Sequence, residues 1–205
     1  MSTTHFTSAN IQSWERFYRT NFINSLSGFK SATLIGTNDT AAYPNLAIFS
    51  NIVHIGADPA LIGFINRPLE AAPHTLCNIK ATGIYTMNHI HTSFIKAAHQ
   101  TSAKYASGVS EFEKTGLTIE WKENIPAPFV GESKIKYVLE LEEIVPIKQN
   151  GTYLVIGKVS AIFLEENIVD EDGFLHIENA GSISSLGIDG YYEPHFITRL
   201  PYAKP

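Results

Sequence analysis

Hydrophobic residues gather in short runs separated by polar turns, and the clearest example lies between residues 45 and 67. One apolar run extends from Leu46 to Ile55 and stops at Gly56-Ala57-Asp58-Pro59. A second run continues from Ala60 to Ile65. Because glycine, aspartate and proline interrupt regular structure, this pattern predicts two strands joined by a turn.

Polar side chains stand in or beside these apolar strands at Asn45, Ser50, Asn66 and Arg67. A buried hydrogen-bonding group without a partner costs free energy, so each of them needs one. For any one of these residues taken alone, a hydrogen bond to nearby backbone is a sufficient explanation. Together they supply the hydrogen-bonding groups and the cation that an anionic small molecule needs at the rim of a sheet.

Further strands are predicted over residues 30–37, 84–88, 135–142 and 153–164. Within 135–142 the odd positions, from Ile135 to Leu141, are apolar and alternate with Lys136, Val138, Glu140 and Glu142. This period of two predicts a strand with one face in water. The Asn150-Gly151 pair before the last strand predicts a hairpin turn.

Helices are few and short in this pattern. Residues 11–22 carry an aromatic stripe at helical spacing behind Asn10 as a cap, and residues 1–10 are predicted to be flexible. A helix over Thr75 to Lys80 should end at Gly83, and residues 91–101 also favour a helix. Ser110 and Glu113 match a capping box before a helix that Gly116 closes.

Strands therefore arrive at irregular intervals with a few small helices between them. Helices do not alternate regularly with strands, which argues against a doubly wound parallel sheet. The pattern favours a mainly β fold, an antiparallel barrel with short peripheral helices, formed by residues 1–205 as a single domain.

Composition narrows the function classes. The chain has 205 residues, is 44% hydrophobic and carries a net charge of −5 with scattered basic residues, which disfavours nucleic-acid binding. No secretory signal and no apolar run that could span a bilayer are seen, so we expect no membrane partner. Cys77 is the one cysteine, and the absence of an intramolecular disulfide fits a cytoplasmic location.

Several common sites are missing. The chain has no G-x-G-x-x-G, G-x-x-x-x-G-K-[ST] or G-x-S-x-G motif. His89 and His91 lack further ligands at metal spacing, so we predict no metal site and read them as loop or interface histidines. Cys77 is predicted to be buried and structural. The glutamates of residues 140–143 are predicted to be solvated surface, and the acidic segment 170–172 lacks the spacing of a calcium loop.

An ordered set of motifs remains. It comprises S-A-T-L-I-G-T (31–37), H-I-G-A-D-P (54–59), H-T-L-C-N-I-K-A-T-G (74–83), T-S-A-K-Y (101–105), S-E-F-E-K-T-G-L-T (110–118), A-P-F-V-G-E-S (127–133) and N-G-T-Y-L-V-I-G-K-V (150–159). In this order they resemble the flavin reductase-like family of FMN-binding split β-barrels, in its flavoredoxin branch. The resemblance covers roughly residues 15 to 195.

The resemblance implies an antiparallel split β-barrel that binds FMN in a groove at a homodimer interface. The flavin ring would lie along Asn45, Leu46, Ala47, Ile48, Phe49 and Ser50, whose N–H groups would reach its polar edge. The phosphate would be held by Ser50, Arg67, Thr75, Ser102 and Lys104, and the ribityl chain by Asn66 and Asn78. Tyr105 and Tyr191 or Tyr192 would cover the ring. Many relatives have proline where Ile48 stands, so the contact at that residue differs.

The implied activity is that of a flavin reductase-type oxidoreductase. It would accept hydride from NADH or NADPH at flavin N5 and pass electrons to a flavin or another acceptor, without a catalytic side chain. One alternative is a flavin-binding electron carrier without NAD(P)H activity of its own. Another is a pyridoxamine phosphate oxidase-like enzyme, which would need more basic phosphate ligands than this sequence has.

Overall fold

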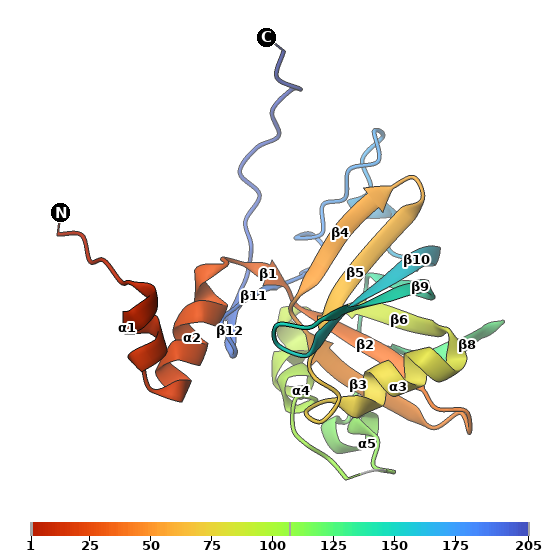
Figure 1. Ribbon diagram of the computed structural model, residues 1–205. Coiled ribbons are helices and arrows are strands. Elements are labelled where there is room, and N and C mark those ends of the chain that lie inside the picture. The colour runs from red at the N-terminus through yellow and green to blue at the C-terminus, as the bar shows by residue number, and fades with distance from the viewer. Residues whose placement is uncertain (1, 107, 205) are drawn as a thin grey trace.

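The computed structural model describes residues 2–106 and 108–204 (Figure 1). Its main element is a seven-stranded antiparallel sheet with the order β3-β2-β6-β9-β10-β5-β4. These strands are β2 (Thr33–Asn38), β3 (Pro44–Phe49), β4 (Ile52–Ala57), β5 (Ala60–Asn66), β6 (Ile84–His89), β9 (Lys136–Ile147) and β10 (Thr152–Phe163). Mainly β, antiparallel structure was predicted, and it is confirmed.

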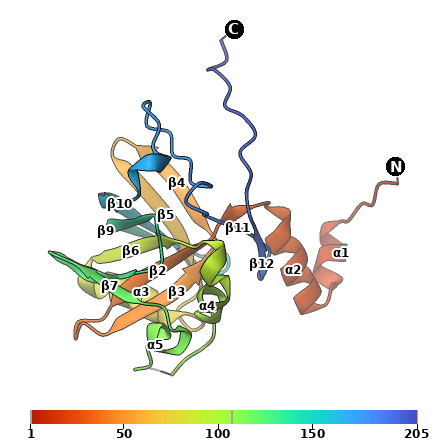
Figure 2. The same cartoon turned by 180° about the vertical axis from the view of Figure 1, so that it is seen from behind.

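Two small sheets and a set of short helices surround the main sheet (Figures 1 and 2). The small sheets contain β1 (Lys30–Ser31), β11 (Ser184–Leu186) and β12 (Gly190–Tyr192), and β7 (Ile119–Lys122) with β8 (Ile125–Val130). The α-helices are α1 (Ser8–Ser13), α2 (Arg16–Leu26), α3 (Pro73–Thr82), α4 (Ile95–Gln100) and α5 (Glu111–Thr115), and the 3₁₀ helices are η1 (Thr92–Phe94) and η2 (Glu166–Ile168). No helix in the described ranges is both long and apolar enough to cross a membrane.

The two large core clusters lie on opposite faces of β2, because successive side chains of a strand point to opposite sides. Leu34 belongs to the cluster that α4 and α5 cover, with Phe94, Ala98 and Phe112. Ile35 belongs to the cluster that α3 covers, with Leu76, Ile79 and Tyr85 among its members. Every residue of β2 is therefore buried.

The expected helix over residues 11–22 is two helices instead. Thr7 caps α1, and Asn10 completes the capping box from inside the helix. The chain then turns at Trp14, and the Glu15 carboxylate caps α2 by accepting the N–H groups of Phe17 and Tyr18. The predicted start was wrong because the stronger capping pair lies three residues earlier, and residues 8–10 are helical.

The apolar run from Leu46 to Ile55 was predicted as one strand, and this was wrong. The chain leaves β3 after Phe49, passes through Ser50 and Asn51, and begins β4 at Ile52. The turn predicted at residues 56–59 joins β4 to β5 and is confirmed. The Ser50-Asn51 corner thus connects the two edge strands of the main sheet.

Strand β9 differs from its prediction in its first half. Lys136 and Val138 were expected to face water, but both are buried. The Lys136 ammonium pairs with Glu120 of β7 and donates to the Val130 carbonyl of β8 at 3.0 Å. The β7–β8 hairpin therefore covers a face that the alternation alone assigns to solvent, while Glu140, Glu142 and Glu143 are exposed as expected.

Two helix ends are confirmed by their glycines. Gly83 and Gly116 follow α3 and α5 with φ values of 74° and 73°, a left-handed conformation that glycine adopts without strain. The prediction of a capping box at the start of α5 was wrong, because the Ser110 side chain makes no cap hydrogen bond. The Glu111 side chain, and not that of Glu113, turns inward.

The N-terminal arm (α1 and α2) and the C-terminal tail (residues 193–204) both project from the body of the sheet (Figures 1 and 2). Neither helix of the arm has a buried residue. The tail is attached to the segment before it by Arg199, which pairs with Asp172 at 2.6 Å and lies over the Phe174 ring. The arm and the tail are thus held by few contacts within one chain.

We predict that His89 makes the folded state sensitive to acid. Burial lowers the pKa of His89 to about 4, and its ring hydrogen-bonds the Ser182 hydroxyl at 3.0 Å. The imidazole of the unfolded chain binds a proton near pH 6.5, whereas the folded protein binds it only near pH 4. This histidine therefore costs no stability above pH 6.5, and the free energy of unfolding falls as the pH drops from 6.5 toward 4. The expected loss of unfolding free energy is about 2 to 3 kcal/mol, measured by urea denaturation at each pH.

The variant His89→Gln should remove most of this slope, whereas His54→Gln should leave it unchanged, because His54 is exposed. Equal pH dependence in the protein with and without His89 would contradict the prediction.

Candidate functional site

Strand β3 is an edge strand, so one side of its backbone is not used by the main sheet. The Leu46 N–H points to that side and donates to the Glu111 carboxylate at 3.0 Å. Strand alternation turns the Ile48 N–H, two residues on, to the same side. A proline at this position would lose no ladder hydrogen bond, so the Ala-Ile pair adds a donor to the outer edge.

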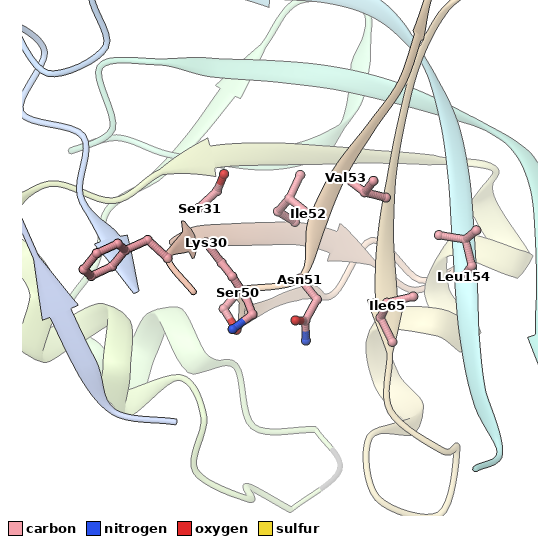
Figure 3. A pocket seen from close by; sticks show the side chains of 9 residues that line it. Lys30, Ser31, Ser50, Asn51, Ile52, Val53, Ile65 and Leu154 are labelled. Carbon is pink, nitrogen blue, oxygen red and sulfur yellow. The ribbon is translucent and has the colours of Figure 1, made fainter. Parts of the chain in front are cut away.

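A hollow of about 520 Å³ opens where β3 ends (Figure 3). Ser50 and Asn51 form one wall, and Ile65 and Leu154 lie on the facing strands. Phe29, which precedes β1, also lines the hollow. Its remaining lining residues are Lys30, Ser31, Ile52 and Val53. A mostly apolar surface with a few polar groups is the usual lining of a small-molecule site, and the volume lies in the usual range.

The other end of β3 carries a hydrogen-bonded amide cluster. The Thr37 hydroxyl oxygen accepts from Asn45 at 3.3 Å and from Asn78 at 3.1 Å. Asn45 also lies 3.4 Å from the hydroxyl of Thr75, which is buried. These bonds tie β2, β3 and α3 together, and the two amides line a polar niche of about 120 Å³ with His74.

Asn66 closes the loop between β5 and α3. Its side-chain amide donates to the carbonyls of Arg67 at 2.7 Å and Ala72 at 3.3 Å. The residue is fully buried, and its Oδ1 finds no partner in the described part of the chain. Ala72 cannot cap α3 with a side chain, so this helix keeps open N–H groups that suit an anion.

The exposed cations of the predicted phosphate site lie on two loops. Arg67 follows β5, and Lys104 lies in the segment after α4 with Ser102, which is also exposed. Neither cation has an ion-pair partner among residues 2–106 and 108–204, so both charges are open to an anion. Tyr105 is partly buried and accepts a hydrogen bond from Gln100 at 2.9 Å.

Two further tyrosines were expected to cover the ring. The ring of Tyr192 packs edge-to-face against the ring of Phe29, which lines the hollow, with the ring centroids 4.8 Å apart. Tyr191 turns instead toward His99, whose Nδ1 lies 2.8 Å from its hydroxyl. Tyr192 is thus nearer the hollow, and the covering role of either residue stays a prediction.

The predicted set is therefore spread along one path. Leu46 to Phe49 form the outer edge strand, and Ser50 lines the hollow at its end. Asn45, Thr75 and Asn78 form the cluster at the other end of β3, and the loops carry Asn66, Arg67, Ser102, Lys104 and Tyr105. The predicted set of site residues did not include Phe29, Lys30, Asn51 and Glu111. The polar Ser50-Asn51 pair inside an apolar run was a usable signal, whereas Glu111 lies 65 residues from its partner Leu46.

Other residues weighed from sequence have different roles. His91 hydrogen-bonds the Glu132 carbonyl at 2.8 Å, and the described residues hold no cluster of three or more metal-ligating side chains. Cys77 is exposed, so the prediction that it is buried was wrong. The inward face of α3 is formed by Thr75, Leu76 and Ile79, which leaves position 77 on the outside.

These features fit a flat, amphipathic anion such as FMN. The hollow offers apolar walls, the outer edge of β3 offers N–H donors to a polar ring edge, and the start of α3 offers donors, with Arg67 on the loop that precedes it. No single residue identifies the ligand.

Comparison with known proteins gives a consistent result. The sequence profile of the flavin reductase like domain matches residues 26–181. A crystal structure from Shewanella frigidimarina, described as a candidate flavin reductase with a split barrel domain, is 45% identical and superposes with a TM-score of 0.94 over 98% of this chain and 100% of that one. The split β-barrel expected from the resemblance is thereby confirmed.

Two more distant structures share the fold. Nitrilotriacetate monooxygenase component B from Bacillus cereus is 21% identical, with a TM-score of 0.84 over 97% of this chain and 100% of its own. Flavoredoxin from Desulfovibrio vulgaris is 20% identical, with a TM-score of 0.73 over 85% of this chain and 92% of its own. At this identity the likeness concerns the fold alone.

We predict that Asn66→Asp destabilises the protein by about 3 kcal/mol, because it places a carboxylate against two carbonyl oxygens in a buried position. Urea unfolding measures this loss. Asn51→Asp is the matched control, since Asn51 is exposed, and it should change stability by less than about 0.5 kcal/mol. Similar losses in both variants would show that Asn66 does not hold the loop.

Proposed function

This chain belongs to the flavin reductase-like family, and from that membership we propose that it binds FMN and works as an NAD(P)H-dependent oxidoreductase. The observation that carries the proposal is the apolar hollow at the end of an edge strand whose outer N–H groups face away from the sheet. A ring with one polar edge and two apolar faces matches this arrangement.

In the proposed complex, the outer edge of β3 orients the ring. The N–H of Ile48, and beyond it that of Ser50, donate to the polar edge of the ring, while Ile65 and Leu154 contact an apolar part. Donors at this edge stabilise the negative charge that reduction brings there. The apolar walls exclude water from the same region.

The phosphate end is proposed to lie at the start of α3. The open N–H groups of the first helical turn point at the anion, and Arg67 and Lys104 neutralise it from two sides, with the Ser102 hydroxyl as a further donor. Asn66 holds the loop that carries Arg67, and its role toward the ribityl chain stays a prediction because its Oδ1 is buried. Thr75 and Asn78 support this end through the Thr37 cluster.

Bound FMN would supply the redox chemistry, taking a hydride from NADH or NADPH at N5 and passing electrons to a second flavin or another acceptor. The protein's residues then bind, orient and shield the ring. No side chain near the hollow is needed as an acid or base, and none is proposed as catalytic.

We further propose that two copies of the chain form a homodimer over the hollow. Phe29 and Val53 line it and are 63% and 43% exposed, and Ile55, two residues after Val53 on β4, is 41% exposed. An apolar patch next to an open site is a common feature of a subunit interface. A second copy would cover the patch and close the hollow.

The FMN proposal predicts that the double variant Arg67→Ala/Lys104→Ala raises the Kd for FMN by about a hundredfold or more, because two charge-assisted hydrogen bonds are lost. Quenching of flavin fluorescence measures the Kd. Affinity for riboflavin, which lacks the phosphate, should not change. Lys134→Ala/Lys158→Ala removes two exposed cations that no proposed FMN contact uses and should leave FMN binding intact.

Unchanged FMN affinity in the Arg67/Lys104 variant would overturn the phosphate assignment. A protein that is colourless as purified, and whose melting temperature does not rise with FMN, would overturn the flavin proposal itself. Anaerobic addition of NADH or NADPH should bleach the FMN-loaded protein. A yellow protein that neither nucleotide bleaches would be an electron carrier without NAD(P)H activity.

The homodimer proposal predicts that Val53→Arg yields monomers and weakens FMN binding at least tenfold, since a charge cannot be buried in an apolar interface without cost. Light scattering after size exclusion gives the mass. Ile162→Arg is the control, because Ile162 is exposed on β10 away from the hollow. A native monomer that still binds FMN would contradict the shared groove.

A further inference from the structure

Glu111 is a buried carboxylate beside the proposed flavin site, and the proposed function gives it no role. It is 6% exposed and lies at the first position of α5. Its Oε2 accepts the outward N–H of Leu46 at 3.0 Å, on the same edge of β3 that is proposed to face the ring. The next N–H on that side belongs to Ile48, about 7 Å further along the strand.

The packing of α5 fixes the position of this carboxylate. Phe112, the next residue, is 2% exposed and packs in the same core cluster as Leu46. The burial of Phe112 therefore holds the backbone of Glu111 next to β3.

Keeping the Glu111 carboxyl ionised in this buried position costs free energy. Burial raises the pKa of the Glu111 carboxyl above its ordinary value, while the hydrogen bond from Leu46 and the nearby charge of His74 act in the opposite direction. His74 is the titratable group on α3 that faces it. A neutral glutamine could accept the same N–H without the cost of burying a carboxylate, so the hydrogen bond to Leu46 does not by itself require a charge at this position.

We propose that Glu111 is a positioning residue that fixes the outer edge of β3 against the flavin and, through its negative charge, makes the bound flavin harder to reduce. This inference rests on the proposed FMN site. Reduction brings negative charge onto the polar edge of the ring, and a carboxylate held along the same edge disfavours that charge. The flavin thereby becomes a stronger electron donor to its acceptor.

Two variants separate the charge from the hydrogen bond. Glu111→Gln keeps an acceptor for Leu46 and removes the charge, so the melting temperature and the FMN Kd should change little. The equilibrium between reduced and oxidised flavin should shift at least tenfold toward the reduced form, which is a rise of about 30 mV for two electrons. Anaerobic titration against a reference dye measures the potential.

Glu111→Asp keeps the charge and withdraws it from the strand. Its flavin potential should stay near that of the native protein, while the FMN Kd rises at least tenfold because the edge of β3 is no longer held. Glu113→Gln on the exposed side of the same helix is the control for both variants and should change neither quantity.

A native potential in FMN-loaded Glu111→Gln would overturn the electrostatic role and leave the proposed function intact. An unchanged Kd in Glu111→Asp would overturn the positioning role, and this second measurement decides the matter if the glutamine variant does not fold. Failure of the native protein to bind FMN would overturn the inference together with the proposed function.

Discussion

The burial of β2 on both faces is the constraint on which the rest of the structure depends. Leu34 and Ile35 point into different core clusters, so helices must cover both sides of one strand. Gly36 has no side chain because the carbonyl of Pro128 and the hydroxyl of Thr86 lie where a Cβ would be. The β8 strand can therefore cross β2 closely. Strand β3 pairs with β2 on one side in the main sheet and is an edge strand with its other side free.

The free side of β3 explains why a site forms there. A central strand uses its N–H groups on both sides, whereas an edge strand offers a row of them to a ligand or to another chain. Glu111 takes one of these groups at Leu46, and α5 covers that part of the edge. Beyond it, toward Ser50, the edge meets the apolar hollow, which keeps the remaining donors available beside an apolar surface.

Buried polar groups give this region its rigidity. The hydroxyl of Thr37 joins two amides from different elements, and the Asn66 amide closes the loop that leads to α3. Each of these groups would cost free energy if it lost its partners, so the surrounding chain is restricted to few arrangements. A ligand bound between the edge of β3 and the start of α3 would meet donors that are already in position.

The sequence by itself determined the order and type of most strands, the C-terminal ends of α3 and α5, and the family. Apolar alternation, turn glycines and ordered motifs are local properties, so they can be read without the fold. It did not determine the break at Ser50-Asn51, the burial of Lys136 or the place of Glu111. Lys136 looks solvent-facing until the β7–β8 hairpin covers it, and nothing in the sequence distinguishes Glu111 until α5 packs on β3. The polar Ser50-Asn51 pair carried a local signal of the break, whereas the positions of Lys136 and Glu111 were decided by tertiary structure alone, since each depends on a contact between segments that are distant in the sequence.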